Sequence, residues 1–265
     1  MLLAYSFVRF FMKSYVKNNY HTHTMRCKHA VGEDKEYVEA AIAAGIQELG
    51  FSDHIPMPVD DERMNRIRMS RAEVDDYMDS ILSLKREYRN DISIKVGFEG
   101  EYYAPLFHDQ MKLLEQYPYD YLILGQHFLE VDGEGGYTGW ESKDKKWITT
   151  YVDTCVEALE TGAYSYLCHP DLIHFTGDDA YWNMEMRRLC LYCKEKNIPM
   201  EYNLLGALEG RHYPSERFFA LAGEVGNEII IGIDAHDPKQ IGKIEPYEKA
   251  LDIIEKYQLK VIDRI

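Results

Sequence analysis

The sequence has little of what marks secreted, membrane-spanning or nucleic-acid-binding proteins. Its 265 residues include five cysteines, an odd number without the spacing of a disulfide framework, which favours a reducing, cytoplasmic location. Basic residues are also scarce, since 30 lysines and arginines face 45 acidic residues and the net charge is −15. Because such a charge repels nucleic-acid phosphates, we expect no nucleic-acid partner.

The apolar N-terminus lacks the features of a signal peptide or a membrane anchor. Residues 1–19 are apolar and then basic, Arg9 interrupts the apolar run, and no Ala-x-Ala cleavage pattern follows. The run is too short to cross a bilayer, so we expect no membrane partner. We interpret residues 1–18 as an extension. Residues 19–265 are then a single domain, because no linker or low-complexity segment divides them.

From residue 19 onward, short apolar runs alternate with longer segments of helical period. The predicted strands are Asn19–His23, Glu48–Ser52, Ile92–Phe98, Tyr121–Leu124, Ser165–Cys168, Pro199–Tyr202 and Ile229–Ile233. The predicted helices span residues 34–46, 70–88, 106–117, 144–161, 179–196, 214–226 and 246–257. Strands separated by crossover helices are parallel, so the pattern predicts an α/β barrel. The alternative, an open doubly wound sheet, usually carries a Gly-rich phosphate loop, which is absent here.

Two local patterns refine this assignment. Ser70 and Glu73 have the spacing of a capping box and mark the start of the second helix. Cys190 and Cys193 form a C-x-x-C in the middle of a predicted helix, whereas a redox-active pair belongs at a helix start. We therefore expect them to be buried thiols.

Potential metal ligands follow the predicted strands. Seven of the ten histidines lie at strand ends or in the loop just after, and Glu99 and Asp234 lie at the ends of the third and seventh predicted strands. These histidines are His21, His23, His29, His54, His127, His169 and His236. In parallel barrels the active site lies at the carboxyl ends of the strands, and buried carboxylates require cations. Nine ligands exceed the four that one zinc takes, so they fit two or three divalent ions, with zinc, manganese or iron suited to imidazole and carboxylate.

Clusters of this kind hydrolyse phosphate esters, because the ions lower the pKa of a water molecule and stabilise the phosphoryl oxygens. A resemblance extends this inference. The motifs, in chain order, resemble those of the polymerase-and-histidinol-phosphatase (PHP) superfamily. They are His21-Thr22-His23, Ser52-Asp53-His54, Gly97-Phe98-Glu99, Gly125-Gln126-His127-Phe128, His169-Pro170-Asp171 and Asp234-Ala235-His236.

The resemblance implies a PHP-type fold, a distorted (β/α)7 TIM-like barrel with a trinuclear metal centre. It implies that one ion is held by His21, His23, Glu99 and Asp234. Glu99 would bridge to a second ion, held also by His127 and His169. The third ion would be held by His29, His54 and His236.

Within the superfamily, Gly97–Tyr103 and Ala207–Ser215 are similar to segments of the monofunctional histidinol-phosphate phosphatases. The similarity implies hydrolysis of L-histidinol phosphate, a small-molecule substrate, to L-histidinol and phosphate in histidine biosynthesis. Arg211 is then a phosphate clamp, and His174 stands where relatives commonly place a basic residue. Glu101, Glu130 and Asn203 are candidate partners for the substrate's amine and imidazole. Asp234 is the candidate catalytic residue for proton transfer.

Two other functions remain compatible with these residues. The same barrel and ions could act on another phosphomonoester, such as a phosphotyrosyl peptide or a nucleotide. A non-catalytic metal-binding scaffold is the other reading, and missing ligands would mark it, but none is missing. Residues 56–68 have no clear period and form either a lid over the site or a plain surface loop. The sequence leaves the oligomeric state open.

Overall fold

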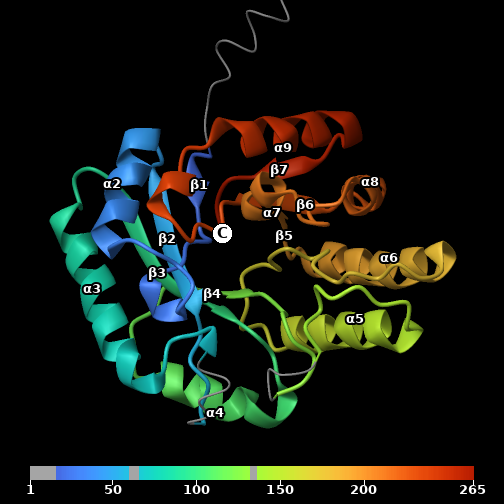
Figure 1. The fold of residues 1–265 in the computed structure, drawn as a ribbon, viewed down its shortest axis with the longest axis horizontal. Helices are drawn as coiled ribbons and strands as arrows, with labels where there is room; N and C mark the ends of the chain where they lie inside the picture. Colours follow the sequence, from blue (N-terminus) through green and yellow to red (C-terminus); the bar gives the residue numbers. More distant parts are fainter. Residues whose placement is uncertain (1–15, 60–65, 132–135) are drawn as a thin grey trace, which may run out of the picture.

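The computed structural model describes residues 16–59, 66–131 and 136–265. Their strands form two sheets in which every pair of neighbours is parallel (Figure 1). The first sheet has the order β1 (Asn18–Asn19), β2 (Glu48–His54), β3 (Ser93–Gly100) and β4 (Tyr121–Leu124). The second has the order β5 (Met200–Asn203), β6 (Glu228–Gly232) and β7 (Lys260–Ile262). The parallel arrangement agrees with the predicted α/β class.

The two sheets are joined on both sides, which makes a distorted TIM-like barrel. Leu167 bridges to Leu124 of β4 and to Met200 of β5, and Thr22 bridges to Ala235 after β6. The predicted strand Ser165–Cys168 is therefore in the expected place but is not a regular strand. It pairs with its neighbours at isolated positions, and the extended backbone ends at His169, whose φ is +28°.

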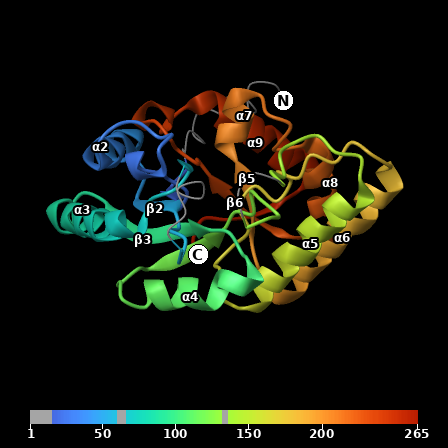
Figure 2. The same cartoon turned by 60° about the horizontal axis from the view of Figure 1, so that its bottom comes forward.

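Helices surround the sheets on the outside (Figures 1 and 2). Helices α2 and α3 flank the first sheet, whereas α5, α6, α8 and α9 lie on the side of the second sheet. The helices are α2 (Asp34–Ala44), α3 (Val74–Glu87), α4 (Ala104–Leu114), α5 (Lys145–Glu160), α6 (Asp179–Lys196), α7 (Leu204–Glu209), α8 (Glu216–Val225) and α9 (Ile244–Tyr257). Single 3-10 turns are η1 (Met25–Cys27), η3 (Arg71–Glu73) and η4 (Pro238–Gln240).

Two apolar layers fix the barrel. The larger lies between helices and strands, where Tyr37, Phe51 and Phe98 are fully buried. The smaller cluster is formed by side chains of strands and strand-like segments, among them Tyr121 and Tyr166. The hydroxyl of Tyr121 donates to the backbone oxygen of Tyr20, 2.7 Å away, just before the first His-x-His pair. The buried side chain of Tyr121 therefore holds the backbone in place just before His21, the first residue of the polar cluster.

The sequence missed short elements and misplaced several boundaries; β2 and β3, for example, each run two residues beyond their predicted ends, to His54 and Gly100. Strand β7 and helix α7 were not predicted, because segments of three and six residues carry little periodicity. Strand β1 ends at Asn19 rather than His23, although Thr22 still pairs with Ala235.

Other expectations are confirmed. Ser70 and Glu73 form a capping box, which here opens the turn η3 before α3, and Cys190 and Cys193 are buried. In the part of the chain that the structure describes, no helix is both long and apolar enough to span a bilayer. Residues 1–15 of the predicted extension and 60–65 of the 56–68 segment lie outside the described residues.

Candidate metal centre

The predicted ligands all come from the carboxyl ends of the strands. His21, His23 and His29 lie in the segment that follows β1, His54 ends β2, and Glu99 is the last residue but one of β3. The remaining ligands follow β4, the Leu167 segment and β6; they are His127, His169, Asp234 and His236. The parallel register of β2 and β3 places His54 directly opposite Glu99, and the Nδ1 atom of this imidazole lies 2.9 Å from Glu99 Oε2.

Three of these side chains, His21, His23 and Asp234, form one compact ligand set, and Glu99 lies beside it. His21 Nε2 lies 3.4 Å from Asp234 Oδ1 and 3.6 Å from Glu99 Oε1. His23 Nε2 lies 3.2 Å from Asp234 Oδ1 and 3.5 Å from Glu99 Oε2. Atoms bound at about 2.0 Å to one tetrahedral ion lie roughly 3.3 Å apart. The spacing of His21, His23 and Asp234 therefore suits one tetrahedral cation, whereas Glu99 approaches the two histidines with different oxygens.

Two further groups adjoin this set. Glu99 Oε1 lies 2.9 Å from His169 Nε2 and 3.5 Å from His127 Nε2, so the same carboxylate reaches a second group. His29, His54 and His236 offer ligand atoms within 4.8 Å of one another and form the third. His29 is exposed, which makes the third group the most open to solvent.

Unpaired polar atoms in the cluster indicate that cations belong there. The buried atoms His21 Nε2, Glu99 Oε2, Asp234 Oδ1 and His236 Nε2 have no hydrogen-bond partner. Buried polar atoms are normally paired, and each unpaired one is costly. Two cysteines that the sequence did not connect to the site also adjoin it: Cys27 groups with His23 and His236, and Cys168 with Glu99 and His169.

The pKa values of the histidines in the cluster are shifted in opposite directions, as expected where many charged groups lie close together. Burial opposes protonation of His21, but the negative charges of Asp234, Glu201 and Glu99 outweigh it and raise the pKa of this imidazole well above its usual value. Burial and the positive charge of His23 lower the pKa of His236 to about 3. The acidic part of the cluster therefore attracts positive charge, which divalent cations supply more effectively than protons.

Each of three imidazoles has a buried carboxylate behind it. Glu201 Oε1 lies 2.8 Å from His21 Nδ1, and Asp53 Oδ1 lies 3.4 Å from His23 Nδ1. Glu101 Oε1 lies 3.4 Å from His127 Nδ1. Carboxylates in this position orient a ligating imidazole and raise its basicity. The sequence showed these acids at strand ends, but their pairing with individual imidazoles depends on contacts between distant segments.

Glu101 and Asn203, two of the predicted substrate contacts, are bonded to other buried side chains and are not among the residues that line the cavity. Glu101 Oε2 accepts a bond of 2.6 Å from buried Arg68, whose charge outweighs the effect of burial and lowers the pKa of Glu101 to about 2. Asn203 donates to both Glu201 and Asp234 at 3.0 Å, and its oxygen caps α7 at Gly206. Glu101 lies beside His127 and Asn203 beside Asp234, so both adjoin predicted metal ligands.

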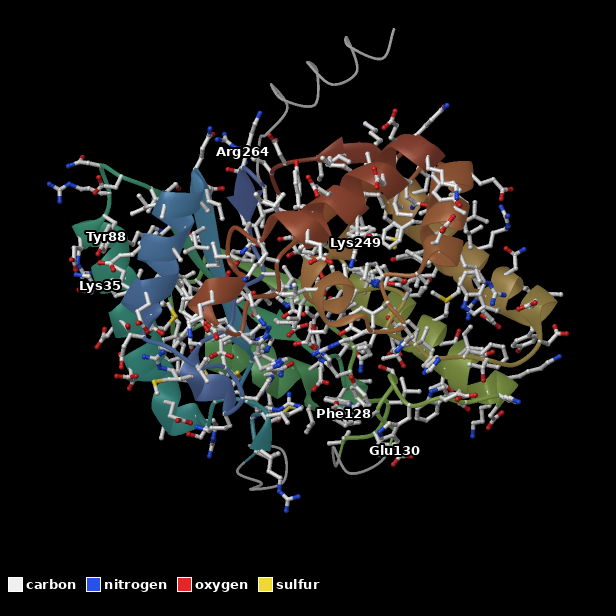
Figure 3. All side chains as sticks on the ribbon, turned by 45° about the horizontal axis from the view of Figure 1, so that its top comes forward. Lys35, Tyr88, Phe128, Glu130, Lys249 and Arg264 are labelled. Carbon is white, nitrogen blue, oxygen red and sulfur yellow. The ribbon has the colours of Figure 1, made fainter. Side chains whose placement is uncertain are left out.

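The cavity above the cluster has a volume of about 330 Å³, the size expected for a small-molecule site. Besides five of the histidines, Glu99 and Asp234, it is lined by Ile67, Phe128, Tyr137, Leu205, Glu209, Arg211 and Tyr213; the five are His23, His29, His54, His127 and His236. Figure 3 shows Phe128 at one end of the molecule and Arg264 at the other. Ile67 belongs to the 56–68 segment, so the described end of that segment contributes to the cavity wall.

Arg211 is the predicted substrate residue that the structure brings to the cavity. Its guanidinium contacts Glu209 at 2.6 Å and the hydroxyl of Tyr213 at 2.5 Å. The motifs His-Pro-Asp and Tyr-Pro-Ser meet at the base of this loop, where the Ser215 backbone donates to Asp171 at 2.5 Å. A segment next to the ligand His169 therefore anchors the loop that carries Arg211.

His174 and Glu130 lie outside the cavity lining. His174 stacks on His212 with ring centroids 4.0 Å apart, and it is not among the lining residues. Glu130 is exposed on the loop beyond Phe128, as Figure 3 shows. The sequence hypothesis for these two side chains therefore gains no support from their positions.

Residues 19–204 match the family model described as "PHP domain". A Deinococcus radiodurans protein named "Probable histidinol-phosphatase" is 26% identical over 232 residues, covering 84% of this chain and 87% of that protein. The "Histidinol-phosphatase" of Bacillus subtilis is 36% identical over 123 residues, covering 44% of this chain and 46% of that protein.

A solved structure shares the fold. It is that of histidinol phosphate phosphatase from Lactococcus lactis, complexed with zinc, L-histidinol and phosphate. The TM-score is 0.72 at 19% sequence identity, and the match covers 93% of this chain and 95% of that one.

Proposed function

The chain belongs to the PHP domain family, and from this premise we propose that it is a metal-dependent phosphomonoesterase that hydrolyses L-histidinol phosphate to L-histidinol and phosphate. The observation that carries the proposal is that Arg211 lines the same cavity as seven of the nine predicted imidazole and carboxylate ligands. The names and the ligands of the relatives supply the substrate.

Two or three ions of zinc, manganese or iron would be held by the three ligand groups described above. When bound, such ions lower the pKa of a water molecule and stabilise negative charge on phosphoryl oxygens. The relative with zinc, L-histidinol and phosphate supports this choice of cofactor.

The side chains of the cavity suit the two ends of this substrate. Arg211 provides a planar pair of donors for the phosphate oxygens. Glu209 lines the same cavity and is positioned to meet the substrate's ammonium group. Phe128 and Tyr137, whose rings are 5.5 Å apart, offer aromatic surface for the substrate's imidazole.

Asp234 is the candidate for proton transfer. Its Oδ1 atom faces the cluster without a hydrogen-bond partner. Burial would raise the pKa of this carboxyl, but the charge of His21 and its other histidine neighbours lowers it well below the usual range. The ionised carboxylate can accept a proton from the attacking water and return it to the oxygen that leaves as the alcohol of histidinol.

A phosphate-release assay tests the proposal. The metal-loaded protein is compared on L-histidinol phosphate, p-nitrophenyl phosphate, a phosphotyrosyl peptide and a nucleoside monophosphate. We expect kcat/KM to be highest for L-histidinol phosphate. Equal values on the aryl phosphate or the peptide would support a different phosphomonoester, and no release from any of them would contradict the proposal.

We also expect a cytoplasmic enzyme, because all five cysteines are free thiols.

A further inference from the structure

We propose that Glu201 is a positioning residue that holds ligands of two separate metal ions while binding none itself. The inference rests on the proposed metal centre. It assigns a role to a side chain that is fully buried and belongs to none of the ligand groups found among the described residues.

The first contact fixes the tautomer of His21. Glu201 Oε1 lies 2.8 Å from His21 Nδ1, and both side chains are 0% exposed. A carboxylate at this distance keeps the proton on Nδ1, which leaves the lone pair of Nε2 free. That Nε2 atom has no hydrogen-bond partner and points towards Asp234 and Glu99. Glu201 therefore presents His21 in its ligating form.

The second oxygen reaches two further ligands. Glu201 Oε2 accepts from the backbone nitrogen of His169 at 3.0 Å and from Asn203 Nδ2 at 3.0 Å. Asn203 Nδ2 also lies 3.0 Å from Asp234 Oδ2, which leaves Oδ1 of that carboxylate directed at His21 and His23. One carboxylate thus restrains His21, His169 and, through Asn203, Asp234.

The restraint on His169 matters because its backbone is strained. Its φ is +28°, a region that residues other than glycine rarely adopt. Such a conformation persists where surrounding contacts over-determine it. The bond from its backbone nitrogen to Glu201 is one of those contacts, and it connects the second ion's ligand to the same carboxylate as His21.

Only a carboxylate satisfies all of these donors. Three N–H groups, from His21, His169 and Asn203, converge on two oxygens, and the hydroxyl of Tyr166 lies 3.5 Å from Oε1. An amide of the same shape offers one oxygen and one NH2 group, so in either orientation it sets a donor against a donor. Glu201→Gln therefore removes the restraint with little change in volume.

The test measures metal affinity rather than activity alone. Full-length protein is loaded with Zn²⁺, dialysed against graded chelator concentrations, and analysed for bound metal. We expect Glu201→Gln to lower the affinity of two ions by about 10- to 100-fold, with the third ion at His29, His54 and His236 retained. Activity should recover in part at raised Zn²⁺, with an unchanged KM for substrate.

Glu185→Gln is the matched control. Glu185, on α6, is also a buried carboxylate, and it accepts hydrogen bonds from Thr149 of α5 at 2.9 Å and from Arg188 of α6 at 2.7 Å. It contacts none of the predicted metal ligands. We expect wild-type metal affinity from this variant. A folded Glu201→Gln protein that holds every ion with wild-type affinity would overturn the proposal, and so would equal weakening in both variants.

A second measurement does not depend on a variant that folds. Nitrogen-15 NMR of the histidine rings in the zinc-loaded wild-type protein should show His21 protonated at Nδ1 and metal-bound at Nε2. Metal bound at Nδ1 would contradict the inference. Failure of the proposed function looks different: a protein that binds the ions as described but releases no phosphate would leave the role of Glu201 intact.

Discussion

At the scale of single residues, Arg211 is the side chain on which phosphate binding should depend most. Its guanidinium lines the cavity and is held by Glu209 and by the hydroxyl of Tyr213. The two partners fix the direction of the guanidinium fork before substrate arrives, which lowers the entropy cost of binding.

We predict that Arg211→Ala lowers kcat/KM for L-histidinol phosphate by about 10- to 150-fold, because hydrogen bonds to charged groups contribute roughly 1.5–3 kcal/mol. Arg211→Lys should recover part of this loss, since it keeps the charge but not the fork. Steady-state phosphate release measures both variants. Arg217→Ala is the control, because Arg217 pairs with Asp179 on the surface of the barrel. Wild-type kcat/KM in Arg211→Ala would disprove the clamp.

Glycine at position 125 leaves space for the bridging carboxylate. A Cβ atom there would lie 1.9 Å from Glu99 Oε1, closer than any real contact. We predict that Gly125→Ala displaces Glu99 and lowers the number of metal ions that remain bound after dialysis. Gly162→Ala is the control, because a Cβ atom at position 162 would contact no other atom. The φ of Gly162 is +70°, so alanine there costs on the order of 1 kcal/mol of stability without displacing a neighbouring side chain. Equal metal content in both variants would argue against this spatial requirement.

At the scale of elements, α7 connects the metal centre to the substrate loop. Asn203 is the last residue of β5 and the N-cap of α7, where its oxygen accepts from Gly206 at 2.8 Å. Its amide nitrogen binds Asp234, and the helix leads to Glu209 and Arg211. One side chain therefore ends a strand, starts a helix and orients a ligand.

We predict that Asn203→Ala and Asp178→Ala each destabilise the protein by about 1 kcal/mol, because each removes an N-cap. Asp178 caps α6 by accepting from Tyr181 at 2.7 Å, away from the metal centre. Only Asn203→Ala should also lower metal affinity and kcat. Thermal unfolding and metal analysis separate the two effects. If both variants retain metal equally, the connection through α7 is wrong.

At the scale of the whole molecule, the ligand groups span both sheets. His54 and Glu99 belong to the first sheet, whereas Asp234 and His236 follow β6 of the second. The backbone joins the two sheets through residues 165–168 on one side and through residues 21–23 and Ala235 on the other. Bound ions would therefore cross-link the two halves of the barrel.

We predict that exhaustive chelation lowers the midpoint of thermal unfolding and that added Zn²⁺ or Mn²⁺ restores it. An ion present at 100 times its dissociation constant stabilises the folded state by about 2.7 kcal/mol. For a chain of this length that corresponds to roughly 5–10 °C per ion. Calorimetry with and without chelator measures the difference. An unchanged midpoint in protein shown to be metal-free would mean that the ions do not join the sheets.

The sequence by itself determined the α/β class, most strand and helix positions and the set of ligand types. Alternating apolar runs and helical segments make a parallel barrel, and the His, Asp and Glu residues at strand ends then fall at one rim. The motifs from His21 to His236 were visible without coordinates because each is local in the chain.

Only the tertiary structure decided which polar groups face the cavity and which stand behind the ligands. Glu101 and Asn203 looked like substrate contacts, yet Arg68 and Asp234 engage them, whereas Glu209 and Tyr137 line the cavity without any local signal. The physical reason is that a buried charged group needs a partner, so the partner determines the role of the group, and these partners come from segments far apart in the chain.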